Sequence, residues 1–120
     1  MSAKGAVKFF TEKLEYETSP SDVHRMLDEK DAVHVFVDVR DAKSFRAGHV
    51  PGAMNVPAAE MPDMLDRLPK GKTLVLYCYN IVCFAAPRAA LYLAKKGYSV
   101  KELVGGFEEY EKRGHPVEKG

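Results

Sequence analysis

Two cysteines are the residues of this sequence best suited to covalent chemistry: Cys78 and, a few positions later, Cys83. Cys78 directly follows residues 73–77, a short apolar run with β-branched and aromatic members that predicts a buried strand. Residues 86–96 then carry apolar side chains at helical spacing, with Pro87 in the first turn and Gly97 as the stop. Cys78 is therefore expected in a loop between the end of a strand and the start of a helix.

Such a loop suits a nucleophilic thiol. Its backbone N–H groups converge on the centre of the loop, and the helix adds partial positive charge. Both effects lower the pKa of a thiol and favour the reactive thiolate. The alternative is that Cys78 only fills space, because free cysteine is among the most buried residue types.

The composition is that of an ordinary globular chain. Of the 120 residues, 46% are hydrophobic and 29% charged, and 18 basic residues against 17 acidic ones give a net charge of +1. A chain with so little net charge has no electrostatic attraction for a nucleic acid or a membrane surface. No apolar run is long enough to span a bilayer. We expect one domain over residues 1–120. The two cysteines are expected to be free thiols and not part of a disulfide framework. The expected location is the cytoplasm, provided that no leader has been removed.

The elements that position the loop follow from the same kinds of pattern. Residues 33–39 form the strongest predicted strand, apolar on both faces, and it ends in Asp38 and Arg40, at the edge where open α/β sheets build their sites. Ser19 is the expected N-cap of a helix that begins at Pro20. The other predicted elements are a helix at 3–13, strands at 14–17, 53–56 and 98–104, helices at 42–47, 62–68 and 107–113, and a loose tail at 115–120. This alternation predicts an α/β fold whose mainly parallel sheet is flanked by helices on both faces.

Several motifs occur in one order along the chain. They are Asp38-Val39-Arg40, then Gly48-His49-Val50-Pro51-Gly52-Ala53-Met54-Asn55-Val56-Pro57, then Leu76-Tyr77-Cys78, and finally Leu103-Val104-Gly105-Gly106-Phe107. Together they closely resemble the rhodanese-like (sulfurtransferase) family over residues 14–113. The resemblance implies a single rhodanese-like domain with a five-stranded sheet, and it assigns the catalytic cysteine of the family to Cys78.

Members of this family take a sulfane sulfur from a donor such as thiosulfate, hold it as a cysteine persulfide, and pass it to a thiophilic acceptor. The resemblance implies a small sulfur donor, with cyanide, a thiol or a protein thiol as acceptor, and neither a metal nor an organic cofactor. Asp38 and Arg40 are expected to pair beside the active loop, and His49 to form a hydrogen bond within its turn. Gly105 and Gly106 are expected to allow close backbone packing.

The predicted active loop departs from the family pattern. It is slightly longer, and it contains neither the glycine nor the basic residue that such loops carry; its residues are Tyr79, Asn80, Ile81, Val82, Cys83, Phe84 and Ala85. Backbone amides of these residues are the expected anion-binding groups, and the nearest basic side chain is Arg88 in the following helix. We therefore expect dianionic thiosulfate to be a poorer donor than a polysulfide or a protein persulfide. Related phosphatases and arsenate reductases end a longer loop with an arginine, which is missing here, so phosphate-ester hydrolysis is not expected.

Cys83 leaves three interpretations open. It resolves a persulfide on Cys78 through a disulfide, it carries the sulfur itself, or it is an inert loop residue. The leading functional interpretation is a sulfurtransferase. The alternatives are a redox-sensing or binding module that uses a Cys78–Cys83 disulfide, and a purely structural partner domain.

Phe9 and Phe10 offer a contact for such a structural role, although packing of these rings on their own domain is favoured. The oligomeric state is left open by the sequence.

Overall fold

One sheet of five parallel strands organises the computed structural model, which describes residues 3–120. The spatial order is β1-β5-β4-β2-β3. The strands are β1 (Glu17–Thr18), β2 (His34–Asp38), β3 (Met54–Asn55), β4 (Thr73–Tyr77) and β5 (Ser99–Leu103). Because β4 is central and pairs with β2 on one side and β5 on the other, the residue that follows it leaves the sheet between the ends of two neighbouring strands. That residue is Cys78, and the predicted fold class is confirmed.

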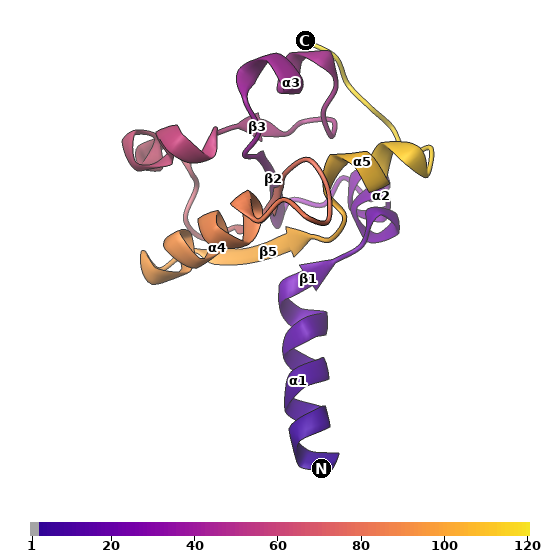
Figure 1. Cartoon of the computed structure of the whole chain (residues 1–120), viewed down its shortest axis with the longest axis vertical. Coiled ribbons are helices and arrows are strands. Elements are labelled where there is room, and N and C mark those ends of the chain that lie inside the picture. The colour runs from indigo at the N-terminus through magenta and orange to yellow at the C-terminus, as the bar shows by residue number, and fades with distance from the viewer. Residues whose placement is uncertain (1–2) are drawn as a thin grey trace.

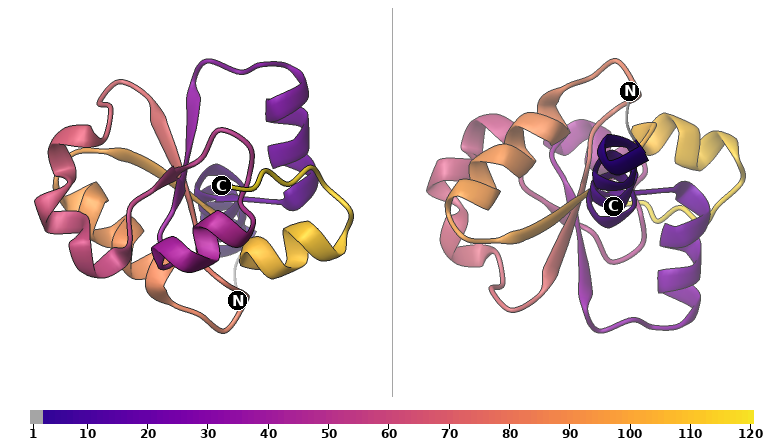
Figure 2. Two further views of the ribbon diagram at one scale, coloured as in Figure 1. Left: turned by 90° about the horizontal axis from the view of Figure 1, so that it is seen from above. Right: turned by 90° about the horizontal axis from the view of Figure 1, so that it is seen from below.

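Helices cover both faces of the sheet (Figures 1 and 2). On one face lie α2 (Pro20–Asp28) and α5 (Gly106–Lys112), and on the other lie α4 (Ala85–Lys95) and the 3₁₀ helices η1 (Ala58–Asp63) and η2 (Leu65–Arg67). The short helix α3 (Ala42–Ala47) follows β2. Each face has its own apolar core, which is why the central strand β4 is apolar on both sides, with Leu74, Val75, Leu76 and Tyr77 fully buried.

Local capping explains where two of these helices begin. The Ser19 hydroxyl accepts a hydrogen bond from the Asp22 amide, and Pro20 occupies the first helical position of α2, as predicted. The Asp41 carboxylate accepts a hydrogen bond from the Ser44 amide at 2.8 Å and so starts α3. Gly48 follows the last residue of α3, again as predicted.

The N-terminal segment differs from the prediction. The helix α1 extends over Ala3–Tyr16 instead of ending at residue 13, and the predicted strand at 14–17 is wrong, because β1 begins only at Glu17. An ion pair of 2.7 Å between Lys13 and Glu17 supports the last helical turn. The helix points away from the body of the molecule (Figure 1) and has no buried residue. The expected packing of Phe9 and Phe10 on their own domain is therefore also wrong.

Two further predictions need correction. The helix expected at 62–68 is replaced by η1 and η2, because Pro62 removes a backbone donor and Met64 breaks the helical path between them. The tail at 115–120 is not loose. The backbone of Glu118 exchanges two hydrogen bonds of 2.9 Å with His49, and the Tyr110 hydroxyl donates to the carbonyl of Pro116. Within residues 3–120, no helix combines the length and the apolar character needed to cross a lipid bilayer.

Candidate active site

Cys78 lies at the C-terminal end of β4, with only 3% of its surface exposed, and belongs to the core that includes Val39, Met61 and Ala86. Its sulfur forms a disulfide with Cys83, so the expectation of two free thiols is wrong for this structure. The disulfide closes the first part of the loop before α4. The arrangement of loop amides around a Cys78 thiolate stays a prediction, because the thiolate is not the state seen here.

A tight turn brings the two cysteines together. The carbonyl of Asn80 accepts a hydrogen bond of 3.1 Å from the Cys83 amide, and its side-chain oxygen accepts another from the Val82 amide. Asparagine favours this kind of turn because its side chain bonds to the backbone two residues on. The turn leaves the α-carbons of Cys78 and Cys83 6.5 Å apart, within the range that a disulfide spans.

Backbone amides at the N-terminus of α5 bind the start of the loop. The amides of Phe107 and Glu108 donate hydrogen bonds of 2.9 Å to the carbonyls of Cys78 and Tyr79. Gly106 makes this approach possible, because it has a φ of +66° and a Cβ there would lie 2.8 Å from the carbonyl oxygen of Cys78. The expectation that this glycine allows close backbone packing is confirmed.

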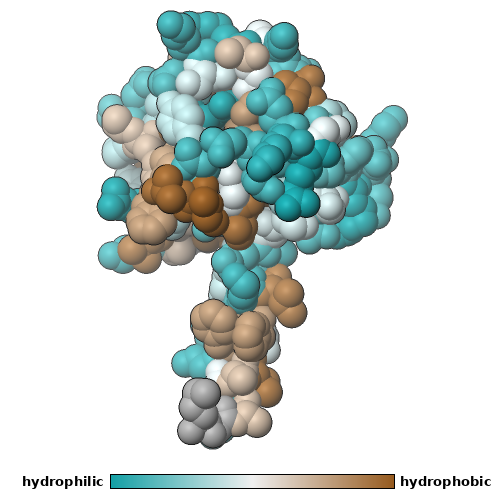
Figure 3. Space-filling model, turned by 45° about the vertical axis from the view of Figure 1, so that its right-hand side comes forward, coloured by the Kyte–Doolittle hydropathy of each residue, from teal (hydrophilic) through white to brown (hydrophobic). Residues whose placement is uncertain are grey.

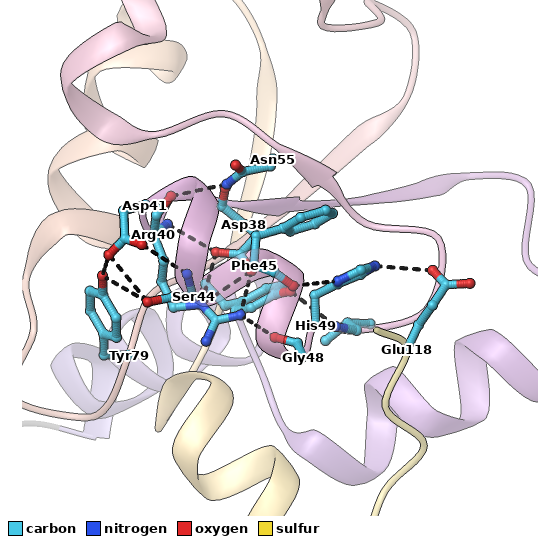
Figure 4. A network of polar contacts seen from close by, with 12 residues as sticks. Asp38, Arg40, Asp41, Ser44, Phe45, Gly48, His49, Asn55, Tyr79 and Glu118 are labelled. Carbon is cyan, nitrogen blue, oxygen red and sulfur yellow. Dashed lines mark hydrogen bonds and ion pairs between the residues drawn. The ribbon is translucent and has the colours of Figure 1, made fainter. Parts of the chain in front are cut away.

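An ion pair between Asp38 and Arg40 supports the end of β2 beside the loop (Figure 4). Arg40 Nη2 donates to Asp38 at 2.7 Å and to the carbonyl of Gly48 at 2.6 Å, and its guanidinium lies 4.3 Å from the centre of the Phe107 ring. Burial alone lowers the pKa of Arg40, but the hydrogen bonds and the charge of Asp38 outweigh it and raise that pKa. The predicted pairing is confirmed. The guanidinium of Arg40 is therefore occupied by its contacts with Asp38, Gly48 and the Phe107 ring.

A second anchor joins the loop to α3, and sequence reasoning missed it. The Tyr79 hydroxyl donates to the Asp41 carboxylate, which also caps α3 through Ser44 (Figure 4). These hydrogen bonds, that of Tyr79 first, lower the pKa of Asp41 to about 2. The N-cap pattern of Asp41 and Ser44 is readable in the sequence, whereas the tyrosine that binds it lies 38 residues away.

His49 and Asn55 tie the motif after α3 to the same framework. His49 Nδ1 lies 2.7 Å from the carbonyl of Phe45, which agrees with the expected local hydrogen bond, and its Nε2 lies 3.1 Å from Glu118. The Gly52 amide and His49 together lower the pKa of Glu118. The Asn55 side chain donates to the backbone carbonyls of Asp38 and Arg40, so these polar groups fix the strand ends around the loop.

The exposed part of the loop is apolar. Ile81, Val82 and Phe84 are 64%, 79% and 60% exposed. Arg88 and Ala85 line a hollow of about 280 Å³ between α4 and η1. The tip of the loop therefore presents hydrocarbon to solvent, and Arg88, the basic residue nearest to it in sequence, lies in the first turn of α4.

The family can now be identified. The model of the rhodanese-like domain matches residues 19–113. This chain belongs to the rhodanese-like domain family. The matched region contains every strand of the sheet except β1, together with the loop and the start of α5 that supports it.

Named relatives agree with this assignment. The thiosulfate sulfurtransferase GlpE of Pseudomonas savastanoi pv. phaseolicola is 34% identical over 95 residues, which cover 78% of this chain and 86% of the relative. The HTH-type transcriptional regulator Rv0324 of Mycobacterium tuberculosis is 40% identical over 84 residues, which cover 70% of this chain but only 37% of that protein. The crystal structure of the BH2092 protein from Bacillus halodurans superposes with a TM-score of 0.93 at 34% identity, covering 98% of this chain and 87% of its own.

The buried ion pair yields a stability prediction. In the Asp38→Asn variant, Arg40 keeps its charge at 6% exposure but loses its counter-ion, so the free energy of unfolding should fall by about 3–5 kcal/mol. Denaturant unfolding followed by circular dichroism measures this. The matched control is Asp22→Asn, which breaks the exposed pair with Arg25 and should cost less than about 1 kcal/mol. Equal losses in both variants would contradict the structural role of the buried pair.

The anchor on Asp41 yields a pH prediction. Its pKa is lowered in the folded state, so its contribution to stability is present above the ordinary value of 3.8 and is lost as the pH falls towards about 2. Tyr79→Phe removes the main cause and should raise the pKa of Asp41 towards 3.8, which carboxyl-carbon NMR titration measures. Tyr16→Phe, on the exposed helix α1, serves as the control and should leave this pKa unchanged. An unaltered Asp41 titration in Tyr79→Phe would disprove the anchor.

Proposed function

We propose that this chain is a sulfurtransferase that carries a sulfane sulfur as a persulfide on Cys78. Three observations support the proposal: membership of the rhodanese-like family, 34% identity to a protein named as a thiosulfate sulfurtransferase, and the place of Cys78 at the C-terminal end of the central strand. The last observation carries most weight, because the carbonyls of Cys78 and Tyr79 are fixed by α5 and the sulfur is thereby held at the start of the loop. We propose the amides of residues 79–85, with Arg88 as support, as the groups that bind the sulfur anion, without a metal or an organic cofactor.

In the first half-reaction, the Cys78 thiolate attacks a sulfane sulfur of the donor. The bond between that sulfur and the rest of the donor breaks, and the electron pair leaves with the donor remnant, as sulfite from thiosulfate or as a shortened polysulfide. In the second half-reaction, cyanide or a thiol attacks the terminal sulfur, and the electron pair of the broken S–S bond restores the Cys78 thiolate. No net oxidation of the protein occurs on this route.

The disulfide favours one role for Cys83 among the three that the sequence left open. We propose that its thiolate attacks the inner sulfur of the Cys78 persulfide. The bond to the outer sulfur breaks, hydrosulfide leaves, and a Cys78–Cys83 disulfide remains. The two cysteines lose two electrons in total and the sulfane sulfur gains them, so a dithiol reductant must then reduce the disulfide before another cycle.

The same disulfide also supports the second candidate function, a redox-sensing or binding module that transfers no sulfur. A reversible cysteine pair in a cytoplasmic protein serves either purpose, since stable structural disulfides are rare in that compartment. We place the protein in the cytoplasm, with residues 1–120 as a single domain whose core spans residues 14–113. The two functions separate on whether a persulfide forms at all.

Cysteine variants test the chemistry. After reduction and exposure to a polysulfide, Cys83→Ser should retain a persulfide on Cys78 that mass spectrometry detects as one added sulfur. The unaltered protein should release hydrosulfide and return to the disulfide, and Cys78→Ser should carry no added sulfur. A persulfide on Cys83 in Cys78→Ser would assign the nucleophile to Cys83 instead, and the absence of added sulfur in all three proteins would favour the redox module.

The donor preference follows from the uncharged loop. The kcat/KM for thiosulfate should be at least about tenfold below that for a polysulfide, because no side-chain cation of the loop offsets the two negative charges. Val82→Lys places an ammonium group at a position that is 79% exposed and should raise the thiosulfate value without a matching rise for polysulfide. Val82→Met is the control for side-chain length. A thiosulfate efficiency equal to or above that of polysulfide in the unaltered protein would refute this preference.

A further inference from the structure

We propose that α1 pairs in antiparallel orientation with α1 of a second copy of this chain, forming a symmetric dimer. The helix comprises 14 residues, none of them buried, and it projects from the body as a separate rod (Figures 1 and 3). It accounts for the elongated shape of the molecule, which measures 48 Å along its longest axis and 33 and 29 Å along the others. The projection leaves its whole length open to another helix.

A helix in this position needs a partner to be stable. Isolated helices shorter than about 12–15 residues are marginal in water even with good helix formers, and α1 also contains Gly5 in its first turns. Packing on its own body does not supply the missing free energy, because no side chain of α1 is buried. The free energy that keeps α1 helical must come from a surface outside the single chain.

The apolar residues of α1 form a seam suited to helix pairing. Ala3, Val7, Phe10 and Leu14 follow one another at spacings of four, three and four residues, as in the core of a coiled coil. In an antiparallel pair, Val7 of one copy lies beside Phe10 of the other, and Leu14 beside Ala3, so every seam residue of one copy meets a seam residue of the other.

The seam offers the apolar area of a small dimer interface. Three of its residues, Val7, Phe10 and Leu14, are more than half exposed, whereas Phe9 and Tyr16, also exposed, lie off the seam. The three seam residues expose on the order of 350 Å², so pairing two copies removes about 700 Å² of apolar surface from water. This area is in the range of weak or transient interfaces.

Charge decides the orientation. Lys4, Lys8, Thr11 and Glu15 form a ridge directly beside the seam, with the lysines in the N-terminal half and the glutamate in the C-terminal half. An antiparallel pair brings Lys4 of one copy near Glu15 of the other, whereas a parallel pair places like charges side by side. The helix macrodipoles also oppose one another favourably in the antiparallel arrangement.

A lipid surface is the weaker candidate for the same face. Helices that lie on membranes carry a predominantly basic polar face, whereas α1 carries two glutamates, Glu12 and Glu15, in addition to its three lysines. The superposed BH2092 structure supports the position of α1, because an alignment over 98% of this chain includes the helix. With a TM-score of 0.93, that alignment extends over the residues of α1 as well as the body of the domain.

The first test measures mass in solution. Analytical ultracentrifugation of the full chain should give a dimer. Phe10→Lys should raise the dissociation constant of this dimer at least about 100-fold, because it replaces an apolar ring at the centre of the interface by a buried charge. Glu12→Lys places the same side chain on the opposite face of the helix and should leave the dimer intact. Amide hydrogen exchange of α1 should be slow in the dimer and fast in Phe10→Lys. A monomer at all concentrations, a larger assembly, or binding of the monomer to anionic lipid vesicles would overturn the proposal.

The second test concerns orientation. Lys4→Glu and Glu15→Lys should each weaken the dimer about threefold, and the double variant should restore the affinity, because each helix then presents the reversed charge to the other. A dimer without this rescue would contradict the antiparallel arrangement. Neither test depends on sulfur transfer, so the dimer and the proposed activity fail or hold independently.

Discussion

The first amides of α5 bind the carbonyls of Cys78 and Tyr79, and the geometry of the loop depends on this contact. A residue that leaves the end of a central strand has no neighbour on the sheet to hold it, so its backbone groups need partners from elsewhere. Here the partners come from a helix that begins at Gly106, where a side chain would collide with the carbonyl of Cys78. The loop therefore starts from a fixed point although its tip is exposed.

The polar network around this point has a consequence for the chemistry. Arg40 is the cation that lies near the end of β2, but its guanidinium is bound to Asp38 and Gly48 and packs against the Phe107 ring. It stabilises the strand end and leaves the loop without a side-chain cation of its own. The tip then consists of Ile81, Val82 and Phe84, and this apolar surface is the basis for the proposed preference for a sulfur donor of low charge.

Much of the scaffold was readable from local patterns. The capping of α2 by Ser19 and Pro20, the helix that ends at Gly48, and the buried strand β4 all depend on residues close in sequence, and each was predicted correctly. Most of the errors concern contacts between distant segments, and the helix predicted at 62–68 is the exception, because Pro62 acts locally. The hydrogen bonds between the tail and His49, and the one from Tyr79 to Asp41, join residues that are far apart in sequence. The helix α1 continues beyond residue 13 because only Glu17 and Thr18 of this segment pair with the sheet.

The sequence by itself determined that a cysteine follows a buried strand and precedes a helix, and that the loop between them carries no basic side chain. These properties depend on periodicity and residue type, which are local. Only the tertiary structure decided that Cys83 turns back to bond with Cys78, that Arg40 is bound by Asp38 within the scaffold, and that no residue of α1 is buried against the body of the domain. Each of these outcomes depends on distances between segments, which are set when the strands pair and the helices pack, and which local patterns along the chain do not reveal.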